Sequence, residues 1–257
     1  MDVKRIDFHV HAKASKRFPF SLPYFWLTVG QARKADLDAF VLTEHFHAPD
    51  FWTVYEVLCQ TMPYDEGVLH LSDEFQILTG AELGVAEGCD LLLMGTLDQL
   101  SRFSQGLAAS PVTGYKPSFA EAIMVARRSS LFVTGAHMFR PGKELGKLGL
   151  AALRQLDALE LNGKDFFLDA AVRAEAVLLG LPVVGGSDAH VWIQVGIKAT
   201  GVPLGKVTPH SVARAVAKSE PAVRSLGYGP VAVQMSGAYK RLLKDKYARE
   251  TAAWAAA

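Results

Sequence analysis

The chain has 257 residues, of which 50% are hydrophobic and 21% are charged, a composition typical of a globular protein that buries one sizeable core. Lys and Arg number 27 against 26 Asp and Glu, for a formal net charge of +1, so no overall field gathers nucleic acid or an anionic membrane. Two cysteines, Cys59 and Cys89, exclude a disulfide framework and are expected to be buried hydrophobic residues in a reducing compartment.

Short apolar runs alternate with helix-length segments along the chain. The first residues are charged where a signal peptide needs an apolar core, and no later segment approaches about 18 apolar residues. We therefore expect a cytoplasmic protein with no membrane partner. The seven predicted strands cover residues 3–10, 40–43, 76–81, 91–94, 131–134, 158–161 and 181–184.

Helix signals lie between and after these strands. Ser118 and Glu121 have the spacing of a capping box, and Thr208 precedes a proline at a first helical position. Strands followed by helices favour parallel pairing through right-handed crossovers. We expect a single domain over 1–257: a distorted (β/α)7 TIM-like barrel with a carboxyl-terminal helical segment at about 236–254. The basic side chains of that segment are expected to form a solvated face, with a nucleic-acid role as the less favoured alternative.

Metal-ligating residue types follow five of the predicted strands. His9 and His11 end the first strand, where strand alternation points both imidazoles to one side. Because the carboxyl ends of parallel barrel strands open on one rim, residues from the other strands should meet them there. These residues are Glu44, His45, Glu82, His137, Asp188 and His190.

The alternative interpretation is a set of core histidines, which is the commoner explanation of an isolated His-x-His pair. Burying five imidazoles and two carboxylates together costs several kcal/mol per ionised group unless each is paired or metal-bound. Imidazole mixed with carboxylate suits zinc, manganese or iron better than calcium or copper. The sequence therefore predicts a divalent metal centre at the rim.

Five motifs, in chain order, resemble those of the PHP (polymerase and histidinol phosphatase) family. They are Asp7-Phe-His-Val-His11, Leu42-Thr-Glu-His45, Gly80-Ala-Glu82, Gly135-Ala-His137 and Gly186-Ser-Asp-Ala-His190. The resemblance runs from residue 7 to residue 190. It implies a distorted (β/α)7 barrel holding two or three divalent metal ions, which in many members hydrolyses phosphoesters.

The resemblance also implies a ligand for each metal, with Glu82 bridging two of them. The first metal would be held by His9, His11, Glu82 and Asp188, the second by Glu82 and His137, and a third by His45 and His190. Glu44 stands where the family has an aspartate and should orient an imidazole from behind.

Two departures from the family pattern concern the remaining ligand positions. Lys16 and Arg17 occupy a segment that often supplies an aspartate or histidine ligand, and no histidine lies between Glu82 and His137. Asp90 could fill the second gap. Because Asp90 begins a predicted strand instead of ending one, we expect water or substrate at that position instead.

The expected activity follows from the metals and from nearby cations. Two bridged metals lower the pKa of a shared water and hold a phosphoryl oxygen for attack. The candidate substrate-binding residues are Lys16, Arg17, Arg140 and Lys164. Arg140 ranks first because a guanidinium fork matches phosphate oxygens.

We therefore expect a phosphoesterase acting on a small phosphorylated metabolite, with Glu82, Asp188 and Arg140 as catalytic residues. One alternative is a nuclease that cleaves phosphodiesters, which the near-zero net charge disfavours. Another is a barrel with a partly lost metal site that acts as a binding or regulatory subunit.

Overall fold

The computed structural model describes residues 2–72, 75–107, 116–143, 145–219 and 221–255. Its strands are β1 (Asp2–Val10), β2 (Ala39–Leu42), β3 (Tyr64–Asp65), β4 (Val68–Ser72), β5 (Phe75–Gly84), β6 (Asp90–Met94), β7 (Phe132–Gly135), β8 (Ala158–Asn162), β9 (Val183–Gly186), β10 (Lys198–Leu204) and β11 (Ala222–Ser225). Its α-helices are α1 (Leu22–Lys34), α2 (Phe51–Thr61), α3 (Leu97–Leu107), α4 (Phe119–Arg128), α5 (Leu150–Leu153), α6 (Asp169–Leu179), α7 (Pro209–Lys218) and α8 (Gly229–Ala255). Three 3-10 turns are η1 (Leu145–Leu148), η2 (Phe166–Leu168) and η3 (Trp192–Gln194).

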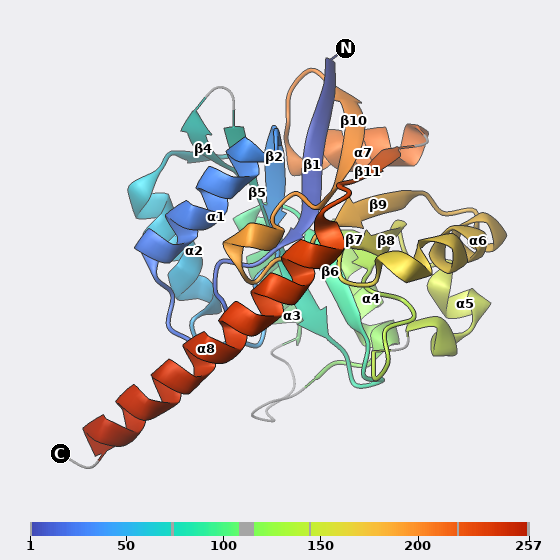
Figure 1. Cartoon of the computed structure of the whole chain (residues 1–257). Helices are drawn as coiled ribbons and strands as arrows, with labels where there is room; N and C mark the ends of the chain where they lie inside the picture. Colours follow the sequence, from blue (N-terminus) through green and yellow to red (C-terminus); the bar gives the residue numbers. More distant parts are fainter. Residues whose placement is uncertain (1, 73–74, 108–115, 144, 220, 256–257) are drawn as a thin grey trace.

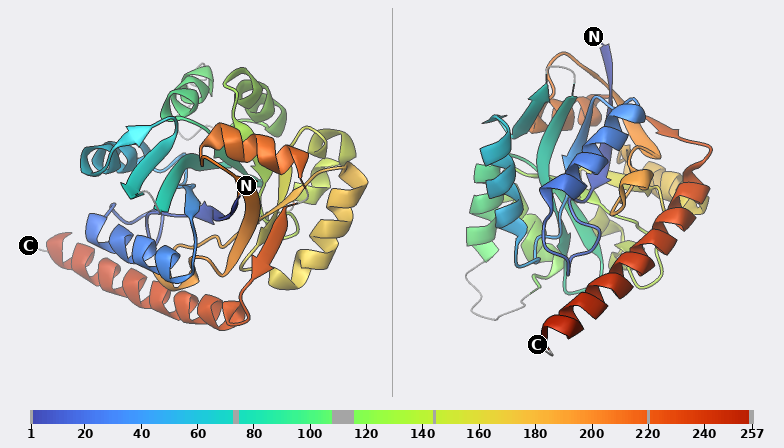
Figure 2. Two further views of the ribbon diagram at one scale, coloured as in Figure 1. Left: turned by 90° about the horizontal axis from the view of Figure 1, so that it is seen from above. Right: turned by 60° about the vertical axis from the view of Figure 1, so that its left-hand side comes forward.

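The seven predicted strands are all present and curl into a nearly closed barrel, which confirms the predicted fold class. Their order around the barrel is β1-β2-β5-β6-β7-β8-β9. A parallel bridge between Val10 and Ala189 brings the chain after β9 back to the end of β1. Seen from above, helices surround the strands (Figure 2).

The direction of β6 differs from the prediction of parallel strands. β6 pairs antiparallel with both β5 and β7. The connection from Gly84 to Asp90 is a tight turn closed by the Val85 amide donating to the Cys89 carbonyl, and it is too short for a crossover helix. The first residue of β6, not its last, therefore lies at the rim where the parallel strands end.

The strands that were not predicted lie outside the seven. β10 pairs antiparallel with β1 and carries β11 on its other side, while the β3–β4 hairpin pairs with β5. Both groups extend the sheet at the end of the barrel where the amino terminus lies (Figure 1).

The core fills the space between the strands and the surrounding helices. The ring of Phe40 on β2 packs against Phe25 of α1 and Phe75 of β5, with centroids 6.2 and 5.7 Å away. Cys89 is buried as expected, but Cys59 is exposed because it lies on the outward face of α2. No helix within the described residues is both long enough and apolar enough to cross a membrane.

Helix α8 begins earlier than the predicted segment and runs along the site end of the barrel. Its inward face buries Ala232 and Ser236. Farther along, Tyr247 packs against Phe18 from the loop between β1 and α1, with ring centroids 4.9 Å apart. Its carboxyl-terminal end projects beyond the other elements (Figure 1).

Candidate metal centre

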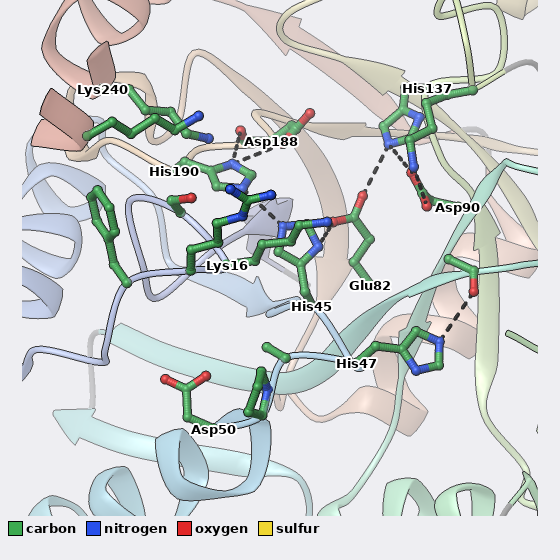
Figure 3. A pocket seen from close by; sticks show the side chains of 18 of the residues that line it. Lys16, His45, His47, Asp50, Glu82, Asp90, His137, Asp188, His190 and Lys240 are labelled. Atoms are coloured by element: carbon green, nitrogen blue, oxygen red, sulfur yellow. Dashed lines mark hydrogen bonds and ion pairs between the residues drawn. The ribbon is translucent and has the colours of Figure 1, made fainter. Parts of the chain in front are cut away.

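A cavity of about 980 Å³ opens at the carboxyl ends of the parallel barrel strands. Its floor is made by the histidines and carboxylates after the strands, and α8 and the β1–α1 loop form one wall (Figure 3). All the residues predicted from sequence to bind substrate line it: Lys16, Arg17, Arg140 and Lys164.

His9 and His11 lie side by side at the bottom of the site and are buried. His9 Nδ1 lies 2.7 Å from Glu160 Oε1 and donates to it, which leaves His9 Nε2 facing His11 Nε2 at 3.2 Å. Burial alone would raise the pKa of Glu160, but His9 holds it below its usual value. A carboxylate behind a ligating histidine fixes the tautomer and the ring orientation in this way.

Gly186 of β9 explains how Glu160 and His9 come so close. A Cβ atom at Gly186 would collide with Glu160 Oε1 and lie 2.6 Å from the Cβ of His9. The glycine lets β9 pass directly against β1 and β8, and any side chain there would push the pair apart.

Glu82 is the carboxylate on which the imidazoles converge (Figure 3). Its oxygens lie 2.8 Å from His45 Nδ1, 3.2 Å from His137 Nε2 and 3.5 Å from His11 Nε2. Burial would raise its pKa, but hydrogen bonds from His137 and His45 hold it well below the usual range. Glu82 is therefore ionised, and both oxygens point into the imidazole cluster.

Asp90 belongs to this cluster, contrary to the expectation from its place at the start of a strand. Its Oδ2 lies 3.5 Å from His137 Nε2 and 2.7 Å from Lys143 Nζ. The physical reason is the antiparallel direction of β6, which brings the beginning of that strand to the rim. No sequence signal marked this direction except the shortness of the turn before it.

Asp188 gathers cations as well as imidazoles. It lies 2.8 Å from Arg140, 2.6 Å from Lys164 and 3.6 Å from His11. Burial would raise the pKa of Asp188, but Lys164 and His9 hold it well below the usual range. Asp188 and His137 have positive φ values of 52° and 29°, a strained backbone of the kind found at functional sites.

The donor atoms form three groups, each with all its atoms within 4.8 Å of one another. The groups are His9, His11 and Asp188; Glu82, Asp90 and His137; and His11, His45 and His190. Imidazole and carboxylate donors that converge at this spacing fit divalent transition metals. The residues therefore fit the group that the motifs imply.

Two neighbouring residues lie outside these groups. Glu44 is fully buried, 3.9 Å from His11 Nδ1, and accepts the backbone N–H of His45. His47 lines the cavity, but its Nε2 faces the carbonyl of Gly84 at 3.4 Å.

The basic face of α8 was expected to be solvated, and the structure corrects this for part of it. Lys240 and Lys244 line the cavity, because the inward stripe of α8 continues past the barrel wall and over the site. Neither residue belongs to a motif, and both lie far along the chain from residues 7–190. The sequence therefore did not predict that they reach the cavity.

Comparison with known proteins supports the fold and the family. A family model described as PHP-associated matches residues 171–221, while no curated protein sequence matches significantly. The solved structure of PsfC from Pseudomonas syringae is 27% identical, covers 95% of this chain and 100% of its own, and has a TM-score of 0.78.

Two other solved structures share the fold at lower identity. The lesion-specific endonuclease PfuEndoQ from Pyrococcus furiosus is 19% identical over 86% of this chain and 57% of its own, with a TM-score of 0.68. A two-domain Bacteroides vulgatus protein containing a predicted PHP-like metal-dependent phosphoesterase is 16% identical over 87% of this chain and 65% of its own, with a TM-score of 0.58.

Proposed function

We propose that the chain is a PHP-type metal-dependent phosphoesterase acting on a small phosphorylated metabolite, on the basis of the PHP-associated match over residues 171–221 and of the shared fold. The observation that carries the proposal is the convergence of imidazole and carboxylate donors beside two cations that already contact Asp188. Hydrolysis of a phosphoester requires a metal-activated water and positive charge that stabilises the phosphoryl oxygens, and this site has residues for both.

We assign the metal ligands to the three donor groups, so that Asp90 joins the set drawn from the motifs. The proposed ligands are His9, His11, His45, Glu82, Asp90, His137, Asp188 and His190. Divalent zinc, manganese or iron bound there would lower the pKa of a water and polarise a phosphoryl oxygen. Glu82 lies between the groups and is the proposed bridge.

Arg140 and Lys164 are the proposed contacts to the phosphoryl oxygens. Arg140 is held by Asp165 and Asn162 as well as by Asp188, so its guanidinium is fixed in direction before a ligand arrives. A preorganised guanidinium loses little freedom when it donates to phosphate. We expect Lys16 and Arg17 to contact a more distant part of the substrate.

A small substrate is favoured by the size of the site. A cavity of about 980 Å³ is at the upper end for a small ligand, and α8 walls one side of it. The near-zero net charge of the chain also disfavours a protein that tracks along a polynucleotide backbone.

The test is hydrolysis of p-nitrophenyl phosphate and of bis-p-nitrophenyl phosphate with added Mn²⁺ or Zn²⁺, with and without EDTA. We expect monoester hydrolysis that EDTA abolishes. We also expect at least a hundredfold loss in Glu82→Gln, because removing a bridging charge weakens two metal sites at once (about 10- to 100-fold for each disturbed site). Glu56→Gln, an exposed change on α2, is the matched control.

Each contrary result favours a different function. Faster cleavage of the diester would favour a nuclease, the activity that endonuclease Q has on the same fold. Metal-loaded protein inactive on both substrates would favour a binding or regulatory subunit. Glu82→Gln with full activity and full metal content would contradict the bridging assignment.

A further inference from the structure

Apart from Lys116, which lines the cavity beside Gly84, the lysines and arginines of the cavity fall into two classes. One class is neutralised within the protein: Arg140 and Lys164 pair with Asp188, and Lys143 pairs with Asp90. The other class, which we call the wall cations, consists of Lys16, Arg17, Lys240 and Lys244. Among the described residues, no carboxylate forms an ion pair with a wall cation.

The wall cations are gathered by a specific packing contact. Lys16 and Arg17 precede Phe18 in the loop after β1, and the ring of Phe18 packs against Tyr247 of α8 with centroids 4.9 Å apart. Lys244 and Lys240 lie about one and two turns before Tyr247 on the same helix. This contact brings two pairs of like charges, from opposite ends of the chain, to one wall.

The position of this wall separates it from part of the metal centre. In Figure 3, Lys240 lies near His190 and Asp188, on the side away from His137 and Asp90. Lys240 is half-buried. Burial, together with repulsion from Lys164, lowers its pKa to about 8. A half-buried lysine facing other lysines is unfavourable in the free protein and is stabilised when an anion binds.

We propose that the wall cations form a second anion-binding subsite, so that the substrate is a small phosphoester carrying a further anionic group, phosphate or carboxylate. The scissile phosphoryl group would lie at the metal centre and the second anion at α8. This inference rests on the proposed function only where it places the scissile phosphoryl group at the metal centre. The subsite itself can be tested by binding without hydrolysis.

Binding of stable analogues tests the subsite. The dissociation constants of butane-1,4-bisphosphonate and butylphosphonate are measured by calorimetry at one fixed metal concentration. Two to three charge-assisted hydrogen bonds to the second anion predict at least about a tenfold preference for the bisphosphonate. The same measurement with 5-phosphonopentanoate tells a phosphate-like second group from a carboxylate.

Variants assign the preference to α8. Lys240→Met combined with Lys244→Met should bring the preference close to onefold, whereas Lys240→Arg should keep it, because the charge is restored. Lys246→Met, on the same helix but outside the cavity, should also keep it. Thermal unfolding of each variant checks that the fold is intact.

Three results would overturn the inference. One is equal affinity of the wild-type protein for the two phosphonates, and another is an unchanged preference in the double variant. The third is displacement of the bisphosphonate by an oligodeoxynucleotide at a lower phosphate concentration, which would assign the subsite to a nucleic-acid backbone. Hydrolysis of p-nitrophenyl phosphate without a bisphosphonate preference refutes the subsite alone, and a preference without hydrolysis refutes the proposed function alone.

Discussion

Asp90 reaches the proposed metal centre from the beginning of a strand, while the other proposed ligands lie near or just after the carboxyl ends of strands. It faces His137 at 3.5 Å and is held by Lys143 at 2.7 Å. We predict that Asp90→Asn weakens metal binding about 10- to 100-fold, because a neutral amide is a poorer ligand for a divalent metal than a carboxylate. The measurement is a metal titration monitored by competition with a chromogenic chelator.

Lys143→Met is the matched control for this prediction. It removes the ion pair but keeps the carboxylate, so metal affinity should stay the same or rise. If Asp90→Asn bound metal as tightly as the wild-type protein, water or substrate would fill the position instead.

Lys240 gives the anion subsite a pH dependence. Its pKa of about 8 means that it is charged below pH 8 and becomes neutral above it. The charged and titratable groups around it include Lys164, Lys244, Asp188, Glu44 and His190. We predict that the preference for butane-1,4-bisphosphonate over butylphosphonate falls as pH rises from 7 to 9 and that Lys240→Arg removes this fall. A preference constant over that range in the wild-type protein would contradict this role for Lys240.

The residues of the centre were predictable from sequence to different degrees. The histidines and carboxylates at or just after the carboxyl ends of β1, β2, β5, β7 and β9 could be placed because side chains at the ends of parallel strands share one rim. Asp90 could not, since pairing direction depends on a turn length and not on residue type. Lys240 could not either, because its place depends on how a helix packs after the last motif.

At the scale of elements, β9 must lie directly against β1 for Glu160 to reach His9. We predict that Gly186→Ala destabilises the protein by about 1–3 kcal/mol, the usual cost of overpacking, and lowers its metal content, because the new Cβ separates Glu160 from His9. Thermal unfolding and elemental analysis of the purified variant measure the two effects.

Gly205→Ala is the control for Gly186→Ala, because nothing lies within 4 Å of a Cβ added there. It should leave the unfolding temperature and the metal content unchanged. An equally stable, metal-replete Gly186→Ala would show that the close approach of β9 is not required.

The elements themselves were largely predictable, and the exceptions share a cause. Each of the seven expected strands matches an observed one to within a few residues, because buried strands appear as apolar runs with turn residues at their ends. β10, β11 and the β3–β4 hairpin were missed. Gly, Pro, Lys and other charged residues in and around them break the apolar pattern of a strand. They form by pairing with β1, with β5 or with one another.

At the scale of the whole molecule, net charge and local charge differ. A formal charge of +1 correctly excludes a globally basic protein, yet it does not report the cluster of cations at one cavity. The composition could therefore constrain the partner class but not the charge of the site. The cavity, walled by α8, concentrates positive charge where metals and a phosphorylated ligand are proposed to meet.

The metal content per chain tests the central claim most directly. Elemental analysis of protein purified without chelators should find two or three equivalents of zinc, manganese or iron, because the described residues form three groups of converging donors. A metal content near zero, unchanged after incubation with each of these metals, would contradict the account. The protein would then have the barrel fold without metal-dependent hydrolysis.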